Sequence, residues 1–152
     1  MMSVADRLRE LGLEIPAVPA PVAAYVPAVR SGGYIYTSGQ LPLRDGQLLA
    51  TGKVGADVSA EDAYEYARQC ALNAIAAVGS QVDLDTVRIV KVVGFVASAP
   101  DFTGQPGVVN GASELLGAAF GEFGVHARSA VGVAVLPLDA PVEVELIAEV
   151  RA

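Results

Sequence analysis

The sequence is poor in the residues that build metal centres and disulfides. Its 152 residues include one cysteine, Cys70, one histidine, His126, and no tryptophan. A single cysteine forms no disulfide within the chain, and a zinc site needs several Cys or His ligands at set spacings. We therefore expect no metal site. Cys70 falls on the apolar side of a predicted helix, which indicates a small core residue rather than a nucleophile.

Charged residues are also scarce, and positive ones most of all. Lys and Arg number 10 against 17 Asp and Glu, the formal net charge is −7, and only 18% of residues are charged. Binding of nucleic acid through its phosphates requires clustered Lys and Arg, and the sequence has no such cluster. With 53% hydrophobic residues, the chain is expected to bury a core and still expose apolar surface. This combination predicts an interface between subunits.

Long uninterrupted apolar runs are missing too. The sequence has no stretch of about 18 apolar residues, so no membrane span is expected. The first 16 residues, MMSVADRLRELGLEIP, carry charges throughout and lack the apolar centre of a secretory signal. The simplest expectation is therefore a cytoplasmic protein. The length suits one domain over 1–152, in which 1–20 form an N-terminal extension with a short helix.

The spacing of apolar residues predicts two long helices and several strands. A short helix is expected over 3–12, with Ser3 as its N-cap, and helical spacing marks 59–79 and 107–121. Alternating or β-branched runs predict strands over 22–30, 33–38, 86–98, 128–136 and 141–150, and a short one near 48–51. This order favours an α+β fold, a mixed sheet with the two long helices packed on one face. The other face then needs a cover.

The last two predicted strands carry the most informative side chains. In the first, 128–136, the valines are expected to point toward the helices, and Arg128 and Ala130 to share the opposite face. In the second, 141–150, Glu143 is expected on that same non-helical face. An arginine in a crevice holds a carboxylate through two parallel hydrogen bonds, and a nearby glutamate holds or activates a water. On the pattern alone, a structural ion pair between the two residues, or their exposure to solvent, is the commoner outcome.

The end of the chain resembles the signature of a known family. The C-terminal block of the Rid family, the reactive intermediate deaminases, closely resembles HARSAVGVAVLPLDAPVEVELIAEV. These proteins are also called YjgF-like or endoribonuclease L-PSP-like. Agreement in order and spacing extends to VAAYVPAVRSGGYIYTSGQLP at 22–42, the helix at 59–79 and VVGFVASAPDFTGQPGVVNGASELL at 92–116. The likeness covers nearly everything after residue 20, and the SGQ turn with the ARS…LP…VEVE block is its most specific part.

The resemblance implies a fold, an assembly and an activity. The fold is a chorismate-mutase-like subunit, assembled as a homotrimer with pockets between subunits. The activity is that of a hydrolase acting on C=N bonds, which converts reactive enamines and imines, such as 2-aminoacrylate, to 2-keto acids and ammonia. It needs no metal or organic cofactor and serves metabolite damage control. The implied partner is a small-molecule substrate with a carboxylate, and neither nucleic acid nor a membrane is expected to bind.

The resemblance also assigns roles to individual positions. Arg128 matches the arginine that holds the substrate carboxylate, and Glu143 matches a glutamate near the attacking water. Tyr25 matches a tyrosine that lines the pocket, and Gly39 matches the SGQ glycine, whose backbone faces the site. Asn110 matches an asparagine in the second long helix. The alternative roles are packing for the tyrosine, a turn for the glycine and local hydrogen bonding for the asparagine.

The chain departs from the family pattern in three places. Many members have a cysteine two residues after the arginine, where this chain has Ala130, so a substrate-binding role for that position would have to use its backbone. The N-terminal helix adds about 15 residues. The segment QLLATGKVG lengthens the connection between SGQ and the first long helix. These features indicate a longer-chain branch of the family.

Two other functions stay open on the sequence. A ribonuclease of the L-PSP type would use His126, close to Arg128, for acid–base catalysis, although the acidic charge and the lack of a basic groove argue against efficient RNA binding. A non-catalytic protein that binds small keto or amino acids would use the same Arg128 pocket without a productive water. Turnover of imines separates the enzyme from both alternatives.

Overall fold

A computed structural model describes residues 2–20 and 23–152 of the protein. The elements follow in the order α1 (Val4–Glu10), β1 (Ala28–Ser31), β2 (Tyr34–Thr37), β3 (Leu43–Arg44), β4 (Gln47–Leu48), α2 (Ala60–Gly79), η1 (Leu84–Thr86), β5 (Val87–Ala97), α3 (Gln105–Phe120), η2 (Gly121–Gly124), β6 (Ala127–Val133), η3 (Pro137–Asp139) and β7 (Val142–Val150). The elements η1 and η2 are single turns of 3₁₀ helix, and η3 is a turn in which Leu138 and Asp139 have positive φ.

Most predicted elements are found within a few residues of their expected bounds. The exception is the strand expected over 22–30, which begins only at Ala28; residue 22 lies outside the described residues. Pro27 stands directly before this strand, and proline has no N–H to donate to a sheet. The short strand expected near 48–51 is β4, which pairs with β3 in a separate two-stranded hairpin.

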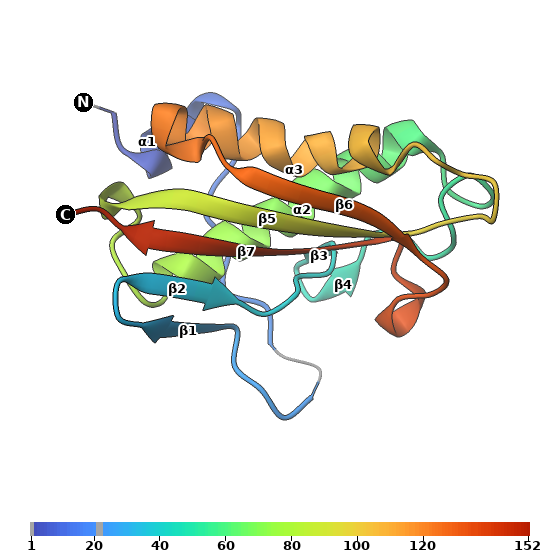
Figure 1. Ribbon diagram of the computed structural model, residues 1–152, viewed down its shortest axis with the longest axis horizontal. Helices are drawn as coiled ribbons and strands as arrows, with labels where there is room; N and C mark the ends of the chain where they lie inside the picture. The colour runs from blue at the N-terminus through green and yellow to red at the C-terminus, as the bar shows by residue number, and fades with distance from the viewer. Residues whose placement is uncertain (1, 21–22) are drawn as a thin grey trace.

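Five strands form one mixed sheet in the order β1-β2-β7-β5-β6. Neighbouring strands are antiparallel except β5 and β6, which run parallel and are joined through α3. The two long helices pack against each other and on one face of the sheet, with α2 behind β7 and α3 along β5 and β6 (Figure 1). The prediction of an α+β fold with a mixed sheet is confirmed.

Helix α2 buries one long face in the core. Ser59 caps it by accepting a hydrogen bond from Asp62 N at 3.1 Å, and small residues follow on its inner face. Cys70 is fully buried among them, as predicted, and burial raises the pKa of its thiol well above the usual value. A thiol without access to its thiolate form is a poor nucleophile. Within the described residues, no helix is both long and apolar enough to cross a membrane.

The contact between α2 and α3 depends on Gly111. A Cβ built on this residue would lie 2.0 Å from the carbonyl oxygen of Tyr64 and 3.3 Å from Arg68 N, both in the backbone of α2. Backbone atoms cannot swing aside as a side-chain end can. The two helices therefore reach this separation only with glycine at position 111.

Replacing Gly111 by alanine is expected to lower the free energy of unfolding by about 3 kcal/mol, because α3 must move away from α2. Gly117→Ala is the matched control in the same helix, since no atom lies within 4 Å of its Cβ position. There alanine is expected to stabilise the protein by about 0.5–1 kcal/mol. Denaturant unfolding of both variants measures the difference, and equal effects would contradict a specific close contact at Gly111.

The N-terminal extension belongs to the same hydrophobic core as the sheet and long helices. Ser3 caps α1 by accepting a hydrogen bond from Asp6 N at 3.0 Å, and the Asp6 carboxylate accepts from Ser3 N in return. Val4 and Leu8 lie within the buried core cluster, and α1 packs against α3. The predicted short helix with Ser3 as its N-cap is thereby confirmed.

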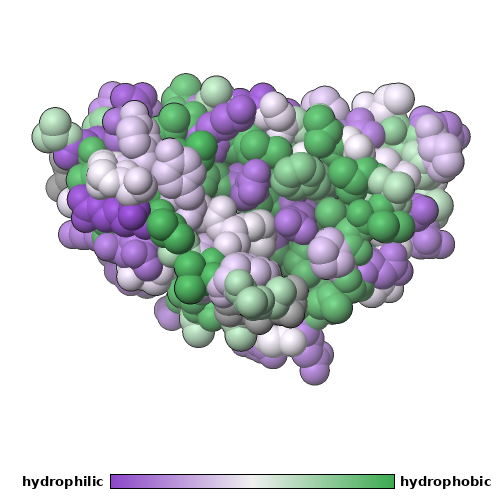
Figure 2. Space-filling model, turned by 60° about the horizontal axis from the view of Figure 1, so that its bottom comes forward, coloured by the Kyte–Doolittle hydropathy of each residue, from purple (hydrophilic) through white to green (hydrophobic). Residues whose placement is uncertain are grey.

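No helix or strand of residues 2–20 and 23–152 covers the face of the sheet opposite the helices (Figure 1), and this face is partly apolar. Four of its residues, Val29, Tyr34, Tyr36 and Val131, are each at least 40% exposed. Cross-strand pairing places Phe95 on the same face, beside Val131. Figure 2, which brings the β1–β2 side forward, shows apolar side chains in groups between polar ones. The expectation that apolar surface stays exposed on the single chain is confirmed; we call this surface the open face.

The valines of β6 point away from the helices, so the prediction that they face the helices is wrong. The strand register places Ala130 beside the buried Gly94 of β5, on the helical side, together with Arg128. At this point α3 lies very close to the sheet, because a Cβ on Gly94 would be 2.5 Å from a methyl of Val109. The alternation of side chains along a strand shows that neighbouring residues face opposite sides of the sheet. It does not show which of the two sets faces the helices. The close approach of α3 selects the small set, and Val131 lies on the open face.

Candidate functional site

Arg128 lies at the start of β6, and its side chain reaches across to α3. Its Nη1 donates to Asn110 Oδ1 at 2.8 Å and to Ser113 Oγ at 3.2 Å, and its Nη2 donates to the Pro106 carbonyl at 3.2 Å. Asn110 and Ser113 stand three residues apart on α3 and therefore share one side of the helix. The sequence predicted Arg128 and Asn110 and missed Ser113, for which this helical spacing was the available signal. We call Asn110, Ser113 and Arg128 the Arg128 cluster.

The guanidinium of Arg128 keeps part of its hydrogen-bonding capacity free of described partners. A guanidinium has five N–H groups, and three are used in the contacts with α3. The Nε–H and the second N–H of Nη2 meet no acceptor among residues 2–20 and 23–152. Nε and Nη2 form one edge of the guanidinium, and such an edge binds both oxygens of a carboxylate. No ion pair joins Arg128 to a carboxylate of the described residues, so the alternative of an intrachain pair with Glu143 does not hold.

His126 is held from both sides of its ring. Its Nδ1 lies 2.6 Å from the carbonyl oxygen of Gly124, and its Nε2 lies 2.9 Å from Ser113 Oγ. With both nitrogens occupied inside the chain, the ring has no free nitrogen for proton transfer to a substrate. This arrangement argues against His126 as the acid or base of a ribonuclease.

Tyr25, Gly39 and Glu143 line a second hollow, which we call the Glu143 pocket. Its volume is about 430 Å³, and its other lining residues are Ala23, Ser38, Leu41 and Pro137. Glu143 is half-buried, and this burial, with the negative charge of Glu145 as a second cause, raises the pKa of its carboxyl group. A carboxylate that gains a proton more readily than usual is suited to accept one from a bound water.

Backbone hydrogen bonds hold the parts of the Glu143 pocket together. Gln40 and Val144 exchange two N–H···O bonds of 2.8 and 3.0 Å, which keep the segment around Gly39 beside the start of β7. The Ser38 hydroxyl donates to the Val26 carbonyl at 2.6 Å and so ties in the segment before β1 that carries the tyrosine. Three stretches that are distant in the sequence thus meet at one hollow.

Gly39 is needed because the carboxylate of Glu143 comes very close to it. A Cβ built on Gly39 would lie 1.9 Å from Glu143 Oε1 and 2.7 Å from Cδ. The absence of a side chain at Gly39 therefore leaves room for the carboxylate of Glu143. The turn role considered for Gly39 does not explain this contact, since the glycine is not among the positive-φ residues. Because of this contact, the backbone at Gly39 lies directly beside the Glu143 carboxylate.

The Arg128 cluster and the Glu143 pocket do not meet within one chain, and the prediction that Arg128 and Glu143 share the non-helical face is wrong. Arg128 lies on the helical side of the sheet, whereas the register places Glu143 beside Phe95 on the open face. Two strand spacings and three residue steps separate their Cα atoms, which corresponds to about 14 Å. Ala130 lies on the helical side with Arg128 and packs partly buried against the core.

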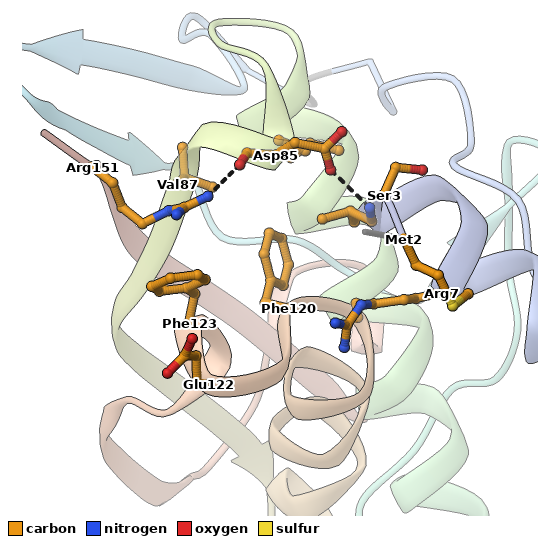
Figure 3. Close-up of a pocket in the computed structure, with 12 residues that line it drawn as sticks. Met2, Ser3, Arg7, Asp85, Val87, Phe120, Glu122, Phe123 and Arg151 are labelled. Carbon is orange, nitrogen blue, oxygen red and sulfur yellow. Dashed lines mark hydrogen bonds between the residues drawn. The ribbon is translucent and has the colours of Figure 1, made fainter.

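A further cavity, of about 220 Å³, lies at the other end of α3 (Figure 3). Arg7 of α1 and Arg151 after β7 reach it, together with Phe120 and Phe123. The guanidinium of Arg151 stacks on the Phe123 ring at 3.8 Å from its centroid. Phe120 is ten residues from Asn110 along α3, about 15 Å away. None of the site residues predicted from the sequence lines this cavity, and it is separate from both parts of the candidate site.

Comparison with known proteins gives consistent matches over almost the whole chain. The model of the family described as Endoribonuclease L-PSP matches residues 16–150. Protein TCP17 of Trypanosoma cruzi is 45% identical over 151 residues, which cover 97% of this chain and 94% of that protein. The 2-iminobutanoate/2-iminopropanoate deaminase of Escherichia coli strain K12 is 39% identical over 132 residues, which cover 86% and 90%.

Solved structures agree with this result. A crystal structure of an Agrobacterium tumefaciens protein of unknown function matches with a TM-score of 0.91 at 45% sequence identity. The match covers 97% of this chain and 92% of that one. At 97% coverage only a few residues of this chain stay unmatched, so the match extends into the N-terminal extension.

Proposed function

Because this chain belongs to the endoribonuclease L-PSP family, also known as the Rid or YjgF family, and a 39% identical relative is named as an imine deaminase, we propose that it hydrolyses small imines or enamines that carry a carboxylate. The products are a 2-keto acid and ammonia. The observation that carries the proposal is the open Nε–Nη2 edge of Arg128, held in place by three hydrogen bonds to α3. This edge would grip the substrate carboxylate in two parallel hydrogen bonds.

In the proposed reaction the protein mainly positions the substrate and one water and moves protons. The carbon of a protonated imine is electrophilic, and one water attacks it to form a C–O bond. Glu143 takes a proton from that water, which gives a neutral carbinolamine, and then returns the proton to the amino nitrogen. The C–N bond breaks as ammonia leaves, and the hydroxyl group loses its proton to ammonia or solvent as the C=O bond of the 2-keto acid forms. Orientation of substrate and water in one pocket supplies much of the rate enhancement. Tyr25 and the backbone of Gly39 would line the substrate on the side of Glu143.

We place the complete site between subunits of a homotrimer. One chain carries the Arg128 cluster and the Glu143 pocket on opposite faces of its sheet, with the Cα atoms of Arg128 and Glu143 about 14 Å apart. A single chain therefore cannot bring both to one small substrate. A neighbouring subunit on the open face would cover its exposed valine and tyrosine side chains, which favours association. It would also bring a second Arg128 cluster to the Glu143 pocket. Ala130 would contribute its backbone beside Arg128.

The activity test uses imines made in place by an amino-acid oxidase, with semicarbazide competing for the imine. The protein is expected to hasten loss of imine and lower the yield of semicarbazone, and a series of amino acids from small to aromatic side chains defines which imines fit. If no imine is hydrolysed faster by the folded oligomer while a 2-keto acid still binds, the chain is a non-catalytic binder. Sedimentation analysis of the same sample checks the trimer, and a monomer would contradict the shared site.

Gly39→Ala is expected to lower kcat/KM for imine hydrolysis by about 10- to 100-fold, because the new methyl displaces the carboxylate of Glu143 by an ångström or more. Thermal stability is expected to change little, since the end of the Glu143 side chain can move. Gly33→Ala is the control, because no atom lies within 4 Å of that Cβ position. Unchanged kinetics in Gly39→Ala would show that the position of this carboxylate does not matter.

A further inference from the structure

A series of hydrogen bonds links Arg128 to Gly124, with donation running from Arg128 to Ser113, from Ser113 to His126 and from His126 to the Gly124 carbonyl. A carbonyl oxygen only accepts, so the 2.6 Å contact with Gly124 requires a proton on Nδ1 of His126. In the neutral ring Nε2 is then an acceptor, and at 2.9 Å it receives the Ser113 hydroxyl proton. The Ser113 oxygen in turn accepts from Arg128 Nη1 at 3.2 Å. Each donor and acceptor in the chain is matched.

We propose that Ser113 and His126 are positioning residues that hold the guanidinium of Arg128 with its open edge toward the substrate. The proposal rests on the carboxylate-binding role of Arg128 proposed above. A long arginine side chain loses considerable conformational freedom when it is fixed. Hydrogen bonds that fix the side chain before the substrate arrives reduce the loss of conformational entropy that accompanies substrate binding. Asn110 and Pro106 fix part of the guanidinium, and the oriented hydroxyl of Ser113 supplies the third anchor.

His126 matters because it decides where the Ser113 hydroxyl points. A serine inside a helix readily donates to a backbone carbonyl three or four residues earlier. Donation to Nε2 of His126 keeps the oxygen instead on the side of α3 that faces β6. His126 stands two residues before Arg128, so side chains at these positions project to the same side of extended backbone.

Gly124, at the end of the hydrogen-bond series opposite Arg128, is fixed by tight packing. A Cβ built on Gly124 would lie 2.3 Å from the backbone oxygen of Leu116 in α3. The carbonyl that orients His126 therefore belongs to a segment pressed against the same helix that carries Ser113. One end of the hydrogen-bond network, at Gly124, is packed against α3. Arg128, at the other end, is held on the same helix through Ser113 and Asn110.

The test measures how tightly variants bind 2-oxobutanoate, a 2-keto acid, by calorimetry, and the KM and kcat for imines. Ser113→Ala and His126→Leu are each expected to weaken binding and raise KM about tenfold, as for the loss of one hydrogen bond to a charged group, with a smaller change in kcat. Ser113→Thr keeps the hydroxyl, and His126→Gln offers an amide oxygen close to the place of Nε2. Both conservative variants are expected to restore most of the affinity.

A spectroscopic measurement separates positioning from a structural role. Nitrogen-15 NMR of the wild type is expected to show His126 with its proton on Nδ1, and the signal of the Arg128 Nε–H is expected to broaden or shift in Ser113→Ala. A proton on Nε2 instead, or wild-type affinity for 2-oxobutanoate in Ser113→Ala and His126→Leu, would overturn the proposal. Equal losses in the alanine and threonine variants would also overturn it. A wild type that binds 2-oxobutanoate but hydrolyses no imine refutes the deaminase function alone, and the affinities still decide the role of Ser113 and His126.

Discussion

Arg128→Ala is expected to lower kcat/KM for imine hydrolysis by about 100- to 1000-fold, since removing one partner of a desolvated charge pair costs about 3–4 kcal/mol. The carboxylate of the substrate would lose the two N–H donors of the guanidinium that bind it. KM is expected to rise strongly, and kcat to fall because the electrophilic carbon is no longer held in front of the attacking water. The fold is expected to survive, because β6 is an edge strand and the guanidinium is only partly buried.

Two further variants make this test specific. Arg128→Lys keeps the charge but offers a single ammonium, which cannot form the two-pronged contact, so only partial recovery is expected. Arg68→Ala removes another arginine with one-third of its side chain exposed, whose contact with Glu65 at 3.9 Å is a weak surface pair. Its kinetics are expected to match the wild type. If Arg128→Ala retained wild-type kcat/KM, the carboxylate would have to bind elsewhere in the chain.

Glu143→Gln is expected to reduce kcat by about 100-fold or more, because the amide cannot take a proton from the attacking water. The pH profile carries the second part of the prediction. Burial, and then the charge of Glu145, raise the pKa of Glu143, and the base works only when ionised. Activity is therefore expected to decline on acidification at a higher pH than an ordinary glutamate would give, and this acid limb is expected to vanish in Glu143→Gln.

Glu145→Gln is the matched control for the pH profile. It removes the neighbouring negative charge and leaves the general base in place, so the pKa of Glu143 is expected to fall toward its usual value. The acid limb is then expected to move to lower pH, with kcat at neutral pH little changed. An acid limb that stays in place in Glu145→Gln, or persists in Glu143→Gln, would assign the titration to another group.

The sequence was sufficient for the parts of the fold that depend on local patterning. Apolar residues at helical spacing, with Ser59 at the start, predicted α2 closely, and strict alternation predicted that Val142, Val144 and Leu146 of β7 face the core. In these segments one face is clearly more apolar than the other, so burial has one solution. The strand expected over 22–30 begins only at Ala28, because Pro27 has no N–H to donate to the sheet.

The candidate site was predicted only in part, because its geometry depends on contacts between distant segments. The likeness to the Rid family pointed to Arg128, Glu143, Gly39 and Asn110. In the structure Arg128 contacts Asn110, and Gly39 packs against Glu143. Ser113 was missed although it stands three residues after Asn110 on the same helix, since this spacing alone does not show that Arg128 packs against that side of α3. The orientation of β6 was wrong, because both of its faces are apolar enough to be buried.

The sequence by itself determined the family, the element order and the types of residue available for chemistry, since these follow from residue identity and local spacing. Only the tertiary structure decided that the small face of β6 meets α3 and that Arg128 and Glu143 lie on opposite faces of the sheet. The physical reason is that the side of a strand that faces inward is chosen by how closely a helix can approach. That distance is set by residues such as Gly94 and Val109, far apart in sequence and in contact only after folding.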